Sequence, residues 1–259
     1  MNAHANLVFQ HAGKFMTIWA ILIGGAAGFA IGGPVGALVG AAAAGVAQTQ
    51  ITRHLNPEQS RKVAFTVIVI ALSAKMARAD GQVTASEIAA FRGKVDIAPE
   101  DVRRVGQFWD LARQTPDGFE AYAKQAVELF GERSALLEQL MDLLFTIARA
   151  DGVIGHEEWD YLSEVAQIFG YDERGFERLS HLYSGSQPAP HLVLGIPADA
   201  DLQTIRTAWK QMARTHHPDQ LIAAGMPEEF IEAATQRLAA INAAYEVMSA
   251  SFRHPASSA

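Results

Sequence analysis

The chain has 259 residues, a formal net charge of −7 and no cysteine. Without cysteine it cannot form disulfides, use thiol catalysis or bind zinc through sulfur. The acidic balance and the lack of a long basic run argue against a nucleic-acid binder. No Walker-type phosphate loop, G-x-S-x-G element or H-E-x-x-H motif is present, so the sequence does not indicate an enzyme.

A long apolar segment follows a short N-terminal tail at residues 1–16. Residues 17–47 carry no charged side chain, and the segment exceeds the roughly 20 residues that a helix needs to cross a bilayer. It therefore predicts a membrane anchor. More basic residues follow this segment than precede it, which favours a cytoplasmic location for the rest of the chain. Gly32-Gly33-Pro34 leaves open a kinked single span or a re-entrant hairpin.

Glycines recur at intervals of four in this segment, at Gly24, Gly28, Gly32, Gly36 and Gly40. On a helix they would form a smooth strip that a second backbone can approach closely. The strip predicts a helix-pairing face and a homodimer through the anchor. The alternative is that glycine is simply common here and the spacing is accidental.

The middle of the chain, residues 55–183, contains an internal repeat. Ala77-Arg78-Ala79-Asp80-Gly81 recurs 71 residues later at 148–152, with an apolar helical pattern before each copy and an acidic one after it. No alternating strand pattern is present. The repeat therefore predicts an all-α, pseudo-symmetric helical bundle.

The repeat places four carboxylates at matching positions, at Asp80, Glu87, Asp151 and Glu158. If they met, they could bind a hard divalent cation through oxygen. The structural alternative is that Thr84-x-x-Glu87 is a capping box and that Asp-Gly is ordinary turn chemistry. The repeated ADG-x-[VI]-x-x-x-E pattern resembles TerB-like domains of the tellurite-resistance type. Acidic metal sites have been proposed for those domains, so the resemblance implies a divalent cation.

A short linker of small residues and proline, 184–189, leads to a C-terminal domain at 190–254, and we expect it to be mobile with limited reach. Ile205, Trp209 and Met212 have helical spacing, with Asp201 as the expected N-cap. A second helix follows Pro227. Its expected apolar stripe is Phe230, Ala234, Leu238, Ile241, Tyr245 and Met248. Each helix has one face that must leave water, so the pair is predicted to lie antiparallel.

The turn of this hairpin is expected to expose His217-Pro218-Asp219. Pro218 fixes its own φ and keeps His217 out of helical geometry, so the turn is stiff. Arg206, Lys210 and Arg214 are spaced by four and line one side of the preceding helix. A basic helix face beside a rigid turn predicts a docking surface for an acidic partner.

The stretches IRTAWKQMARTHHPD and INAAYEVM resemble the second and third helices of a J-domain. The resemblance implies that the partner is a DnaK-type chaperone ATPase, contacted by Arg206, Trp209, Lys210, Arg214, His217, Pro218 and Asp219. In J-domains the loop aspartate engages an arginine of the ATPase. Two departures bear on docking: Trp209 stands where tyrosine is usual, and Gln211 and Gln220 replace common basic residues.

Anchor, TerB-like bundle and J-domain, in that order, resemble the membrane-anchored DnaJ-like co-chaperones of the DjlA type. The resemblance implies a non-enzymatic protein that brings the ATPase to the cytoplasmic face of the membrane and raises its ATP hydrolysis. A different hypothesis is a membrane-associated cation-binding scaffold or sensor, in which the bundle is the active part.

Overall fold

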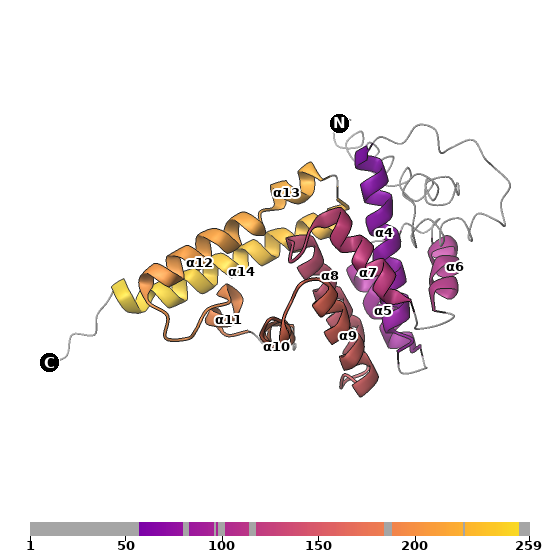
Figure 1. The fold of residues 1–259 in the computed structure, drawn as a ribbon, viewed down its shortest axis with the longest axis horizontal. Coiled ribbons are helices and arrows are strands. Elements are labelled where there is room, and N and C mark those ends of the chain that lie inside the picture. Colours follow the sequence, from indigo (N-terminus) through magenta and orange to yellow (C-terminus); the bar gives the residue numbers. More distant parts are fainter. Residues whose placement is uncertain are drawn as a thin grey trace, which may run out of the picture.

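The computed structural model describes residues 57–79, 83–95, 97, 102–113, 118–183, 188–224 and 226–253. Within these ranges every regular element is a helix, which agrees with the all-α prediction. Figure 1 shows a helical bundle from which a long helical hairpin projects. The bundle consists of α4 (Pro57–Met76), α5 (Ala85–Lys94), α6 (Val102–Ala112), α7 (Phe119–Phe130), α8 (Ala135–Ala148), α9 (His156–Ile168) and α10 (Glu173–Leu182). The C-terminal part consists of α11 (Pro190–Leu194), α12 (Leu202–Thr215), α13 (Pro218–Ala223) and α14 (Glu228–Arg253).

The centre of the bundle is α4, which is surrounded by α6, α7, α8 and α9. Phe65, Ile68 and Leu72 have no exposed surface, and residues 64–77 are buried throughout. A helix that is apolar on every side must lie in the interior, because each face has to leave water. This accounts for the apolar run that the sequence places before the first copy of the repeat.

The two copies of the repeat correspond to α4–α5 and α8–α9. α5 contacts α8, while α9 contacts α4, so each half packs its second helix on the first helix of the other half. The Tyr161 hydroxyl of α9 donates a hydrogen bond to the Leu72 carbonyl of α4 at 2.9 Å. The reciprocal contacts are the arrangement that a pseudo-symmetric repeat leads one to expect.

In the C-terminal part, α12 and α14 lie side by side (Figure 1). Ile205 of α12 and Ala234 and Ile241 of α14 are buried between them, and Asp201 caps α12 by accepting from the Thr204 N–H at 2.7 Å. These features were predicted. Between the two helices, where only the turn of a hairpin was expected, the short helix α13 forms. Pro at the first position of a helix loses no hydrogen bond and has the φ that a helix needs.

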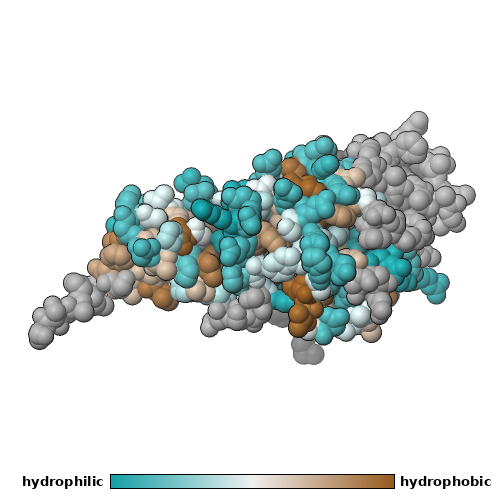
Figure 2. Space-filling model, turned by 60° about the horizontal axis from the view of Figure 1, so that its bottom comes forward, coloured by the Kyte–Doolittle hydropathy of each residue, from teal (hydrophilic) through white to brown (hydrophobic). Residues whose placement is uncertain are grey.

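The bundle and the hairpin contact each other where α14 begins. α14 contacts α8, and α10 contacts α11. The rings of Phe65 and Phe230 meet edge to face, with centroids 4.7 Å apart. The expected mobile linker therefore joins two parts that share a buried junction. The face shown in Figure 2 is mostly hydrophilic, with hydrophobic residues in small separate patches.

The predicted anchor at 17–47 and its glycine strip lie outside the described residues. Within the part of the chain that the structure describes, no helix combines the length and the apolar character that crossing a membrane requires.

Candidate functional site

One side of α12 presents the predicted basic face. Arg206, Lys210 and Arg214 are all exposed, because their spacing places them on the side of α12 that turns away from α14. Trp209 is only half-buried, and its ring stacks on Tyr245 of α14 with centroids 4.5 Å apart. Its indole N–H donates to the Asn242 side chain at 2.8 Å. Trp209 thus joins the two helices of the hairpin.

The tripeptide His217-Pro218-Asp219 forms an exposed corner at the end of α12. His217 is the N-cap of α13, with an extended backbone (φ −69°, ψ 127°). Its side chain is 48% exposed and that of Asp219 is 78% exposed. The His217 Nδ1 lies 3.3 Å from the Asp219 backbone nitrogen and 3.4 Å from an Asp219 carboxylate oxygen. An unprotonated Nδ1 accepts the N–H, whereas a protonated one would pair with the carboxylate.

Hydrogen bonds close the backbone on both sides of this corner. The His216 N–H donates to the Met212 carbonyl at 2.9 Å, which completes α12. The Gln220 side chain donates to the Arg214 carbonyl at 2.9 Å and satisfies one of the last carbonyls of the helix. Gln220, where J-domains often have a basic residue, thus has a structural use here.

Directly before the corner, His216 belongs to a buried cluster of polar and charged side chains that the sequence did not predict. His216 is 2% exposed, and its Nε2 lies 3.8 Å from a carboxylate oxygen of Glu138 on α8. Arg237 of α14 donates to Glu138 at 2.7 Å. Arg178 of α10 donates to Glu138 at 3.3 Å, and the Tyr183 hydroxyl does so at 3.3 Å. Glu138 therefore links the bundle to both helices of the hairpin.

The cluster keeps Glu138 ionised. Burial alone would raise the pKa of Glu138, but the charges of Arg237, His216 and Arg178, with the Arg237 hydrogen bond, lower that pKa to about 2. Burial lowers the pKa of His216 below 6.5, although Glu138 opposes that change. His216 is consequently harder to protonate than an ordinary histidine.

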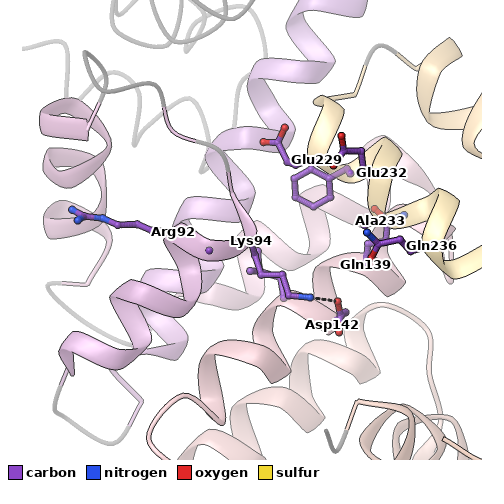
Figure 3. A pocket seen from close by; sticks show the side chains of 11 residues that line it. Arg92, Lys94, Gln139, Asp142, Glu229, Glu232, Ala233 and Gln236 are labelled. Carbon is purple, nitrogen blue, oxygen red and sulfur yellow. Dashed lines mark hydrogen bonds and ion pairs between the residues drawn. The ribbon is translucent and has the colours of Figure 1, made fainter. Parts of the chain in front are cut away.

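A polar cavity of about 530 Å³ lies beside this cluster, between α5, α8 and α14. Figure 3 shows Lys94 directed at Asp142, with Glu229 and Glu232 on the α14 side and Arg92 pointing away from the others. The Lys94 ammonium lies 2.9 Å from the Asp142 carboxylate. Both partners of this ion pair belong to helices of the bundle.

Comparisons with known proteins agree with this architecture. A family model described as "Tellurite resistance protein TerB" matches residues 66–181. A model described as "DnaJ domain" matches residues 189–254, which contain the corner and the basic face. A protein named "Co-chaperone protein DjlA" from Photobacterium profundum is 28% identical over 227 residues, covering 76% of this chain and 80% of its own length. The chain is thus similar to DjlA-type co-chaperones over about three quarters of its length, with a TerB match followed by a DnaJ match.

Other relatives extend this match. The "Co-chaperone protein DjlA" of Coxiella burnetii is 25% identical over 256 residues, covering 87% of this chain and 94% of its own length. That of Shewanella oneidensis is 28% identical over 209 residues, covering 74% and 79%. No solved structure matches the chain. A DnaJ domain implies a DnaK-type chaperone as the partner.

The four carboxylates that the sequence singled out are not seen together. Glu87 is buried and accepts from the Thr84 N–H at 2.6 Å, which makes the predicted capping box of α5. Glu158 accepts from the Gly155 N–H at 2.7 Å, and Asp151 is exposed. Asp80 lies outside the described residues. Among the residues that the structure describes, no group of three or more His, Asp or Glu side chains is placed to hold a metal ion. The cation site stays a prediction.

One indirect sign of the buried cluster is present in the sequence. Glu138 is an acid in the apolar helix ALLEQLMDLLFTIA, and an acid on a buried helix needs a cationic partner. Nothing in a single sequence says which arginine provides it, since Arg237 lies 99 residues further along the chain.

Proposed function

We propose that this chain docks on a DnaK-type chaperone through the His217-Pro218-Asp219 corner and the basic face of α12, and stimulates its ATPase. The observation that carries the proposal is that Asp219 is 78% exposed at the end of an exposed basic face. The bundle contacts the hairpin through α14, so α12 and the corner are open to a partner while the two parts stay together.

The two parts of the surface have different tasks. Arg206, Lys210 and Arg214 steer an acidic surface of the ATPase toward α12, and such rim charges act mainly on the association rate and its salt dependence. Asp219 offers a carboxylate that can pair with an arginine of the ATPase. The chain itself supplies no reacting group, since it acts by shifting its partner toward the hydrolysing state.

We further propose that this takes place at the cytoplasmic face of a membrane. The support is the uncharged segment 17–47 and the basic residues that follow it. Cell fractionation of the full chain and of a variant lacking residues 1–47 tests this directly. The full chain is expected in the membrane fraction and the shortened one outside it; equal distributions would contradict the location.

The ATPase role is tested by measuring ATP turnover of a DnaK-type protein with the full chain, its Asp219→Asn variant and a control, Asp199→Asn. Asp199 is an exposed acid of the same domain, before α12 and away from the corner in sequence. Asp219→Asn is expected to remove the stimulation and Asp199→Asn to keep it. Stimulation that survives in both variants would refute the proposal.

A further inference from the structure

Glu138 belongs to the bundle, but two of its three basic neighbours belong to the DnaJ domain. Its carboxylate receives the Arg237 hydrogen bond from α14 at 2.7 Å and lies 3.8 Å from His216 at the end of α12. The third, Arg178 on α10, is 3.3 Å away and also donates to the Leu192 carbonyl of α11 at 3.4 Å. One acid of the bundle therefore contacts, directly or through Arg178, three of the four helices of the DnaJ domain.

Because these groups are buried, breaking the contact between them has a high cost in free energy. The side chains of Glu138, Arg178, Arg237 and His216 are 6%, 18%, 12% and 3% exposed. If the hairpin moved away from α8, the buried Glu138 carboxylate would keep Arg178 of the bundle but lose Arg237, its partner at 2.7 Å, which is unfavourable. The edge-to-face pair of Phe65 and Phe230 adds apolar contact at the same junction.

The cluster acts on the corner through His216, which directly precedes His217. His216 is buried against Glu138 of the bundle, with its Nε2 3.8 Å from the carboxylate, while the two side chains that follow in the corner, His217 and Asp219, are about half or more exposed. The position of the exposed corner relative to the bundle therefore depends on where His216 is held. Without the bundle, only contacts within the C-terminal part, such as those of α13 with α14, would fix it.

We infer that Glu138 is a positioning residue through which the TerB bundle sets the orientation of the His217-Pro218-Asp219 corner for the ATPase. The inference rests on the proposed function, because it assigns a role to the bundle in that same stimulation. It follows that the bundle is part of the activating unit, and that a change in the bundle near α8 reaches the DnaK-type partner. The basic face of α12, which attracts the partner, does not depend on Glu138.

The test is a titration of ATP turnover by a DnaK-type protein with full-length wild type, Glu138→Gln and a matched control, Asp142→Asn. Asp142 is an acid of the same helix, one turn further on; its ion-pair partner Lys94 belongs to the bundle, and its charge acts on Arg237 less than that of Glu138 does. Glu138→Gln is expected to lower the maximal stimulation by about threefold, within the usual range for coupling between sites. The half-saturating concentration should change by less than about twofold, since rim charges control the encounter.

A second readout separates positioning from loss of fold. Amide resonances of His217, Asp219 and Gln220 are expected to shift in Glu138→Gln and not in Asp142→Asn, with circular dichroism unchanged in both. Arg178→Met provides a milder variant, because it leaves the bond between Glu138 and Arg237, and it should lower the maximal stimulation in the same way.

The inference is overturned if Glu138→Gln and Arg178→Met stimulate like wild type, or if Asp142→Asn is as weak as they are. It is also overturned if only the half-saturating concentration changes. Failure of the proposed function looks different: in that case wild type itself gives no stimulation, or Asp219→Asn stimulates fully.

Discussion

Removing the charge of Glu138 should cost a large part of the stability of the protein. The surroundings lower its pKa from 4.5 to about 2. One pKa unit corresponds to ~1.4 kcal/mol, so the folded protein favours the ionised form by about 3 kcal/mol. Glu138→Gln keeps the shape but not the charge, and it leaves Arg237 and Arg178 without their counter-ion. We therefore expect the free energy of unfolding at pH 7 to fall by about 3 kcal/mol.

The sign of the pH dependence makes this a specific test. Because the folded-state pKa is depressed, the contribution is complete above pH 4.5 and is lost as the pH falls through 2. Urea unfolding of wild type and Glu138→Gln at several pH values measures it. The difference should be full at pH 7 and less than half as large at pH 3. Equal stability at pH 7, or a difference that grows toward low pH, would refute the account of the cluster.

Three further predictions follow from other contacts. In a proton NMR titration, the pKa of His216 should lie below the ordinary histidine value of 6.5. The contribution of the buried neutral form to stability is therefore present above pH 6.5 and declines as the pH falls below that value. A pKa at or above 6.5 would be inconsistent with the burial of His216. Lys210→Ala should raise the concentration of the chain that half-saturates the ATPase at low salt, and added salt should reduce the difference; a defect that ignores salt would indicate a packing role. Glu87→Ala should lower thermal stability by about 1 kcal/mol through loss of the capping box with Thr84, with no change on adding magnesium; a stabilisation by magnesium that disappears in Glu87→Ala would instead support the predicted cation site.

The elements that the sequence predicted well are those whose signals are local. The helical spacing of the apolar residues around Ile205 and around Ile241 predicts two amphipathic helices. Both of these side chains are buried as expected. The pairing of Thr84 with Glu87 is readable because both partners lie within one helical turn. The exposed corner follows from the restricted backbone around Pro218. In each case the deciding interaction lies within a few residues or within one pair of adjacent helices.

The junction could not be predicted for the opposite reason. Glu138 and Arg237 are brought together only by the placement of α14 on α8, and that placement depends on many apolar contacts such as that of Phe65 with Phe230. The linker composition suggested two separate domains, because composition describes the linker and not the surfaces on either side of it. The short helix α13 could not be predicted from Pro218 alone, because a proline that ends one helix also suits the first position of the next.

The central claim is that the exposed corner switches the nucleotide chemistry of a DnaK-type partner. Its most direct test is the single-turnover rate of ATP hydrolysis by such a partner at saturating full-length chain. We expect wild type to raise that rate several-fold above its basal value, which corresponds to an activation barrier lower by roughly 1 kcal/mol or more. Asp219→Asn should leave the rate at its basal value. A rate that Asp219→Asn raises as much as wild type does would contradict the claim.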